Sequence, residues 1–187
     1  MVVAFLGLSA VGDTPEIADS TASEIVDHWL EVANGELSSA LLVLCVPLLL
    51  IFGGLVLDRH RIATSGFDVW AFLFGTGLAI AAVGFITEAA GVAAITDVAD
   101  SGFSDLVVDV YVGGTRVHMI WAVGLSIALL GGAGMFIPRA GVHRVLGWFA
   151  LVGGIAGLIP EPFGFVGVLI AVLWVFATSI VITIRPE

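Results

Sequence analysis

SALLVLCVPLLLIFGGLVLDRHR, residues 39–61, is the stretch that decides the fold class of this chain. Its apolar part, residues 39–57, contains no charged side chain. A run of about 20 mainly apolar residues is what an α-helix needs to cross a bilayer. The run is followed by Arg59 and Arg61, and positive charge is retained on the cytoplasmic side of a membrane. The stretch therefore predicts a membrane-spanning helix with its C-terminal end in the cytoplasm.

The composition of the whole chain agrees with a membrane protein. Of its 187 residues, 59% are hydrophobic and 12% are charged, and the mean hydropathy is +1.15. Soluble domains are about half apolar and about a quarter charged. The net charge of -10 is concentrated in two stretches, one before the first span and one between the second and third. No basic patch is present to meet a phosphate backbone, which disfavours nucleic-acid binding.

Four more apolar segments have the length of a span. Together with the first they predict five complete spans, at residues 39–57, 69–89, 117–137, 143–160 and 163–184. Positive charge is carried by six arginines, and five of them lie at every second boundary between spans. This spacing places residues 1–37 outside the cell membrane and the C-terminus in the cytoplasm. The five are Arg59, Arg61, Arg139, Arg144 and Arg185.

The residues before the first span form a separate extracytoplasmic segment, residues 1–37, ahead of a single transmembrane domain, residues 38–187. Residues 1–11, MVVAFLGLSAV, are apolar but too short to span. They suggest the outer half of a sixth span that begins upstream, or alternatively a short interfacial anchor. Residues 21–34 predict an amphipathic helix that begins with a capping box from Thr21 to Glu24. The predicted fold is an all-α, polytopic transmembrane helix bundle.

Small residues recur at four-residue spacing within the spans and predict close packing between helices of this chain. In lipid, close backbone approach through small residues is a main source of helix association. Of the tryptophans, Trp70, Trp121 and Trp148 lie near span ends and suit the interfacial belt. Trp174, nearer mid-span, is predicted to lie in the core. The small-residue sets are Gly75 with Ala79, Gly77 with Ala81, Gly124 with Ala128 and Gly132, and Gly153 with Gly157.

Four polar residues at the predicted outer ends of spans form the candidate site: Glu88, Arg116, His118 and Glu161. Each lies about 20 residues from the cytoplasmic end of its span or directly beside such a position. Charges near the membrane core are costly, so they tend to pair and often mark function. The cluster is either a binding site for a proton, an ion or a small polar solute, or a structural clamp. The clamp, in which Glu88 pairs with Arg116, is the favoured interpretation.

Other polar residues give weaker signals. His60 and His143 lie in short loops beside arginines and are interpreted as solvated loop residues. A haem held by two histidines would need both inside the bundle, and only His118 is near a span interior. The single Cys45 is interpreted as a small buried hydrophobe. Phosphate-loop, nucleophile-elbow and zinc-site motifs are absent from the sequence, so neither a cofactor nor a metal is expected.

The closing stretch, residues 143–182, resembles the C-terminal part of uncharacterised actinobacterial multi-span membrane proteins. Residues 13–29, DTPEIADSTASEIVDHW, are similar to the segment that follows the first span of those proteins. The resemblance implies a six-span fold and supplies no activity. The residues that carry it are Leu146, Gly147 and Trp148, then Pro160, and then Phe163, Gly164, Gly167, Leu173 and Trp174.

Three functional interpretations follow. The first is a non-enzymatic accessory or sensing subunit, with the lipid bilayer and a membrane-protein partner or a second copy as its contacts. The second is a channel or facilitator for a small solute that uses the Glu88, Arg116 and His118 cluster. The third is a membrane-embedded enzyme, which is disfavoured because no catalytic constellation is visible. The predicted spans carry no mid-membrane charge and no convincing inverted repeat, which disfavours an active carrier.

Overall fold

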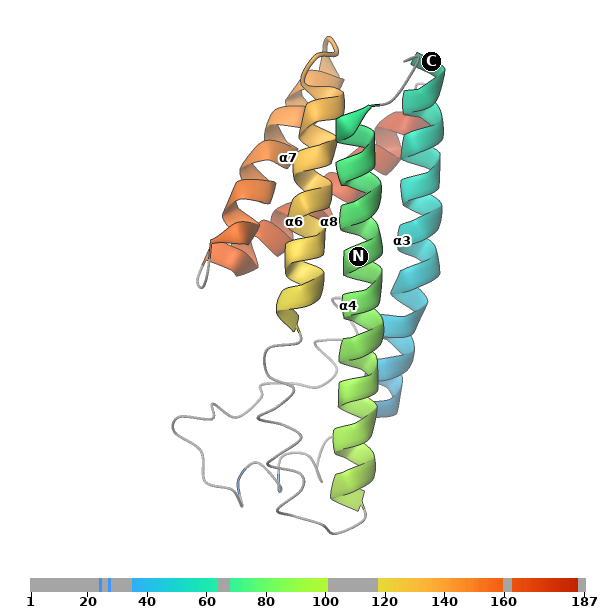
Figure 1. The fold of residues 1–187 in the computed structure, drawn as a ribbon, viewed down its shortest axis with the longest axis vertical. Helices are drawn as coiled ribbons and strands as arrows, with labels where there is room; N and C mark the ends of the chain where they lie inside the picture. Colours follow the sequence, from blue (N-terminus) through green and yellow to red (C-terminus); the bar gives the residue numbers. More distant parts are fainter. Residues whose placement is uncertain are drawn as a thin grey trace. The chain divides into compact units, whose positions relative to one another are not determined.

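Five α-helices make up the described part of the chain (Figure 1). The computed structural model covers residues 1–187 and describes residues 24, 27, 35–63, 68–100, 118–159 and 163–184. No strand occurs within these ranges, which confirms the all-α prediction. The helices are α3 (Gly35–Ala63), α4 (Val69–Asp100), α6 (His118–Phe136), α7 (Val142–Leu158) and α8 (Phe163–Ile184).

Four of the helices are long and apolar enough to cross a membrane, so the chain is a helical membrane protein. Their apolar parts are Leu37–Arg61, Val69–Val98, Met119–Phe136 and Val166–Ile184. Each contains most of a segment that the hydropathy pattern marks as a span. The remaining predicted span, residues 143–160, also forms a helix. This helix, α7, has 17 residues and is shorter than the other four.

Two helices extend beyond their predicted spans. The sequence pattern ends the second span at residue 89, whereas α4 continues to Asp100. Its added residues are mostly alanine, valine and isoleucine and include no proline, so nothing in them stops a helix. Helix α3 is continuous from Gly35 to Ala63 and contains Pro47. Of the predicted helix at residues 21–34, Glu24 and Asp27 are helical and exposed, and the other residues lie outside the described ranges.

The chain forms two compact units. The larger unit comprises Pro47–Gly84 and Met119–Glu187, and the smaller comprises Val2–Val46 and Phe85–His118. Helix α6 lies largely in the interior of the larger unit. Of its apolar stretch, 61% is buried, compared with 22% for that of α8.

In the larger unit, the backbones of α4 and α6 are in direct contact. A Cβ atom added to Gly77 would meet backbone atoms of Gly124 and Ala128. A Cβ atom added to Gly124 would in turn meet backbone atoms of Gly77 and Ala81. Further along α6, Gly131 lies against the backbone of Phe74 of α4 in the same way. The prediction of small-residue packing within the chain is therefore confirmed for this pair of helices.

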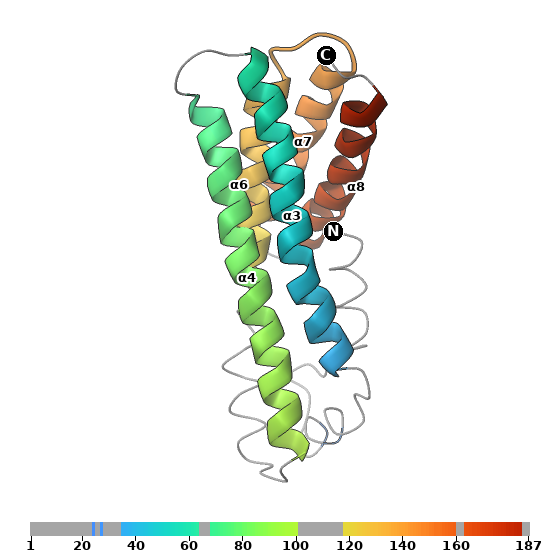
Figure 2. The same ribbon diagram turned by 90° about the vertical axis from the view of Figure 1, so that its right-hand side faces the viewer.

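Helices α7 and α8 pack side by side in the same way (Figures 1 and 2). Gly157 of α7 meets the backbone of Gly167 of α8, and Gly153 lies against the side chain of Ile170. The Gly153 and Gly157 pair thus serves intrachain packing, as predicted. Gly75 does not mark such a close backbone contact. A Cβ atom added there would be nearest to the Leu57 side chain, at 3.7 Å.

An aromatic cluster around Trp174 fills the larger unit. Trp174 is 1% exposed, and its ring centroid lies 5.8 Å from that of Phe136 and 6.1 Å from those of Phe52 and Phe74. Its indole Nε1 donates to the carbonyl oxygen of Leu146 at 2.9 Å, which satisfies the only polar atom of the side chain. The prediction that Trp174 lies in the core is confirmed. Trp70 and Trp148 are exposed, whereas Trp121 is buried against other parts of the chain, and the interfacial depth of all three stays a prediction.

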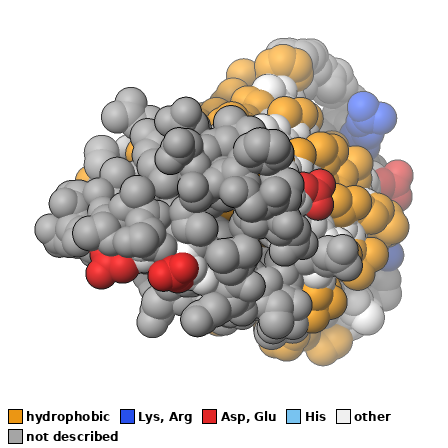
Figure 3. Space-filling view, turned by 90° about the horizontal axis from the view of Figure 1, so that it is seen from below, with side chains coloured by type: hydrophobic (Ala, Val, Ile, Leu, Met, Phe, Trp, Pro, Cys, Tyr) orange, Lys and Arg blue, Asp and Glu red, His pale blue; other side chains and the backbone are white. Residues whose placement is uncertain are grey.

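In the smaller unit, the hydroxyl of Ser39 in α3 donates to the carbonyl oxygen of Ala89 in α4 at 3.1 Å. Ser38, Leu42 and Cys45 are buried, which confirms the prediction for Cys45. Hydrophobic side chains cover much of the described surface in Figure 3. A water-soluble protein rarely exposes so much contiguous apolar area, whereas a bilayer covers it. Large exposed side chains on α3, α7 and α8 include Leu44, Leu48, Ile51, Leu55, Val145, Val152, Leu173 and Phe176.

Candidate functional site

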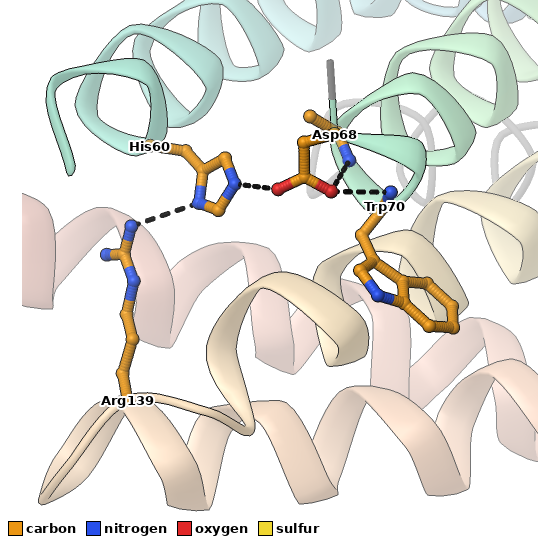
Figure 4. Close-up of polar contacts among 5 residues, drawn as sticks. His60, Asp68, Trp70 and Arg139 are labelled. Atoms are coloured by element: carbon orange, nitrogen blue, oxygen red, sulfur yellow. Dashed lines mark hydrogen bonds and ion pairs between the residues drawn. The ribbon is translucent and has the colours of Figure 1, made fainter. Parts of the chain in front are cut away.

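A polar network lies where α3 ends, α4 begins and α6 turns into α7 (Figure 4). Its centre is His60, in the last turn of α3. The residue is 6% exposed, so its interpretation as a solvated loop residue was wrong. Leu49, Val56 and His60 are all buried and are spaced by seven and four residues, which places them on one face of α3. That spacing was the available signal that His60 points inward.

Asp68 caps the first turn of α4. Its Oδ1 accepts hydrogen bonds from the backbone N–H groups of Trp70 at 2.8 Å and Ala71 at 3.4 Å. These are the second and third helical residues, whose N–H groups have no partner within the helix. Its other oxygen, Oδ2, pairs with Nε2 of His60. One carboxylate therefore fixes the start of α4 and joins it to the end of α3.

The third member is Arg139, from the turn between α6 and α7. Its Nη2 lies 3.1 Å from Nδ1 of His60, and its guanidinium carbon lies 5.3 Å from the centroid of the Phe136 ring. A guanidinium can only donate hydrogen bonds, so Nδ1 of His60 must accept. In a neutral imidazole the hydrogen is then on Nε2, where it is donated to Asp68. Both ring nitrogens of His60 are thus hydrogen-bonded: Nε2 to Asp68 at the start of α4, and Nδ1 to Arg139 in the α6–α7 turn.

The surroundings of Asp68 act on its pKa in opposite directions. Burial alone would raise the pKa of this carboxyl, because it penalises the charged form. The hydrogen bond from His60, those from the backbone of Trp70 and Ala71, and the charge interaction with His60 together outweigh that effect. The pKa of Asp68 is therefore lowered from its ordinary value. The network favours the ionised form, which accepts at both oxygens.

The same end of the larger unit contains a second buried histidine. His143 of α7 is 9% exposed, so it too was wrongly interpreted as a solvated loop residue. Its ring stacks on Phe136 with the centroids 5.8 Å apart and the planes 11° apart. Nε of Arg144 donates to the carbonyl oxygens of Ile137 at 3.3 Å and Arg139 at 3.1 Å. Arg144 thereby satisfies acceptors where α6 ends, a common role for a basic residue at a helix C-terminus.

The site predicted from the sequence lies mostly outside the described residues. Arg116 and Glu161 fall outside them, and of His118 only the backbone position at the start of α6 is described. Glu88 is half-buried inside α4. It lies 19 residues from Val69, roughly 29 Å along the helix at about 1.5 Å per residue. Whether these four residues meet stays a prediction.

The network joins the end of α3 to the start of α4 and to the α6–α7 turn, and its hydrogen-bond donors and acceptors are directed at one another. Among the described residues, no group of three or more His, Cys, Asp or Glu side chains could hold a metal ion. Comparisons with protein-family models, with curated proteins and with solved structures find no match to this chain.

Proposed function

We propose that this chain is a multi-pass protein of the cell membrane that acts as a non-enzymatic accessory or sensing subunit. In the proposed topology, residues 1–37 lie outside and the C-terminus lies in the cytoplasm, because Arg59, Arg61, Arg139 and Arg144 then all lie inside. The His60 network is then at the cytoplasmic surface.

The observation that carries the proposal is the way His60 joins three segments. It connects the end of α3 to the start of α4 through Asp68, and to the α6–α7 turn through Arg139. A change at any one of these groups therefore acts on the ends of several helices together. The backbone contacts between α4 and α6 then keep those helices moving as one body. Such coupling suits a subunit that passes a signal to a partner.

The test is purification of the tagged chain from its native membrane in a mild detergent. We expect one partner protein in fixed stoichiometry with the wild-type chain. We expect the partner to be lost from Gly124→Leu, which separates α4 from α6, and retained by Gly54→Leu, whose Cβ position is open. A chain that purifies alone from several mild detergents would contradict the accessory role.

The position of Glu88 supports a facilitator for a small solute as the second candidate. It is a half-buried carboxylate and the one charged side chain in the first 28 residues of α4. Intramembrane carboxylates often mark a solute pathway. In proteoliposomes, Glu88→Gln should then abolish a solute flux and leave the thermal stability nearly unchanged. A bilayer that stays sealed to every solute tested would contradict this second function.

A further inference from the structure

We propose that His60 is a proton-sensitive latch, in which a second proton on its imidazole releases Arg139, and with it the α6–α7 turn, from the end of α3. The inference rests on the sensing role proposed above and names its stimulus, the proton concentration at the cytoplasmic surface. It follows from how the two ring nitrogens of His60 are used.

The latch depends on the lone pair of Nδ1. In the neutral ring this atom accepts from Nη2 of Arg139 at 3.1 Å. A second proton, taken from water, forms an N–H bond at Nδ1 and uses that lone pair. Two N–H donors and two positive charges then face each other at hydrogen-bond distance. Because a guanidinium can neither accept nor lose its charge, Arg139 has to move away.

The bond to Asp68 responds in the opposite way. Nε2 keeps its hydrogen in both states, and in the imidazolium it donates to a carboxylate from a charged ring. The acceptor is ionised in both states, and protonation adds the attraction between a positive ring and a negative carboxylate. Protonation therefore holds α3 more firmly to the start of α4 while it releases the α6–α7 turn. His60 therefore loses one hydrogen-bond partner and keeps the other, and the helices stay folded.

Charges on the neighbouring elements add to the repulsion on Arg139. On its own helix, His60 is flanked by Asp58, Arg59 and Arg61; Asp68 precedes α4, and α7 brings His143 and Arg144. Helix α8 has no titratable side chain between Phe163 and Ile184. A protonated His60 thus joins four arginines and two aspartates. The positive excess favours movement of the exposed turn.

The turn that carries Arg139 leads directly into α7. It contains Pro138 and Gly141, and Gly141 adopts a φ of 64°, a backbone conformation that side-chain-bearing residues rarely use. Arg139 also rests on the Phe136 ring, which stacks on the ring of His143 of α7. Displacement of Arg139 therefore changes the contacts at the first turn of α7. The loss of the Arg139 contact with α3 is thereby transmitted to α7.

The experiment measures a distance across the latch. Cys45 is first replaced by alanine, and spin labels are placed at Leu55→Cys on α3 and Ala140→Cys in the turn, both exposed. Distances are recorded by pulsed electron resonance at about pH 8 and about pH 5, the range in which histidines change charge. We expect one distance population at the higher pH and a second, longer population at the lower pH. Circular dichroism at both pH values checks that the helices stay folded.

Three variants identify the residue responsible. His60→Gln, which does not titrate, should give the same distances at both pH values. Arg139→Gln should show the longer population at both. His118→Gln, the matched control at the other end of α6, should keep the wild-type response. A wild-type distance that is independent of pH overturns the latch, as does a response that survives in His60→Gln.

The latch and the accessory role can fail separately. A partner that co-purifies with a chain whose distances do not respond to pH leaves the accessory role and overturns the latch. A pH-dependent distance in a chain that purifies alone supports the latch and contradicts the accessory role. Where both hold, partner recovery should differ between the two pH values for wild type and stay constant for His60→Gln.

Discussion

Asp68 has two structural roles, one for each of its carboxylate oxygens. Oδ1 caps the first turn of α4, and Oδ2 pairs with His60. A helix cap is worth about 1 kcal/mol and a side-chain hydrogen bond a similar amount. Asparagine can replace the cap but cannot supply the charge. Substitutions at this one position therefore separate the two tasks.

We expect Asp68→Ala to lower the free energy of unfolding by about 1–2 kcal/mol at neutral pH, since both tasks are lost. Asp68→Asn should cost less, because asparagine caps helices about as well as aspartate. The lowered pKa of Asp68 sets the sign of the pH effect. Its charge stabilises the folded state above the unfolded-state pKa of about 3.9, and this contribution is lost as the pH falls through the lower folded-state value.

Thermal unfolding in detergent, followed between about pH 7 and about pH 2, checks this. The stability difference between wild type and Asp68→Asn should shrink as the pH falls below about 4. A difference that keeps growing as the pH falls below about 4 would contradict the pairing of Asp68 with His60.

At the scale of elements, glycines determine where helices approach most closely. Gly124 of α6 lies against the backbone of α4, whereas Gly54 of α3 has no atom within 4 Å of its Cβ position. The two residues are chemically identical and both lie inside helices, so their surroundings alone should decide what an added methyl group does.

We expect opposite effects from the same substitution at these two positions. Gly124→Ala should destabilise the protein by about 1–3 kcal/mol, because backbone atoms cannot make room as a flexible side chain can. Gly54→Ala should be neutral or stabilising by up to about 1 kcal/mol, since it restricts the unfolded chain. Unfolding midpoints of the two variants in one detergent provide the measurement. Equal losses would argue against the backbone contact between α4 and α6.

The helices were largely predictable and their ends were not. Hydropathy marks the apolar part of a helix, so it located α3, α4, α6, α7 and α8. It could not show that α4 continues to Asp100, because helix formation beyond the hydrocarbon depends on backbone propensity rather than on hydropathy.

The His60 network was missed for a different reason. His60 and Arg139 are 79 residues apart in the sequence, and no local pattern indicates that they meet. Only the position of His60 on the buried face of α3 could have been predicted. Asp68 directly before an apolar run is an N-cap signal, but its second contact depends on tertiary structure. The predicted site at Glu88 remains a prediction.

At the scale of the whole molecule, charge is divided along the chain. Of the described residues, arginines occur only at Arg59, Arg61, Arg139 and Arg144, beside the ends of α3 and α6. Two carboxylates, Asp58 and Asp68, lie near these arginines, whereas Glu24, Asp97 and Asp100 lie before α3 or in the last turns of α4. In the proposed topology the first group is cytoplasmic and the second is outside.

The topology predicts which single cysteines a membrane-impermeant maleimide reaches in intact cells. In a Cys45→Ala background, Glu24→Cys should be labelled directly, and Ala140→Cys only after the membrane is permeabilised. Both positions are exposed, so access to the reagent depends on the side of the membrane. The reverse pattern would invert the proposed orientation, and the latch would then report on the outside medium.

The short length of α7 bears on which lipids surround the protein. Its 17 residues span roughly 26 Å at about 1.5 Å per residue, against a hydrocarbon core of about 30 Å. In the proposed topology the bilayer has to thin beside α7, at a cost of fractions of a kcal/mol per Å. The 32-residue α4 imposes no such demand. Lipids with shorter acyl chains should therefore gather beside α7, and the protein should favour thinner membrane regions.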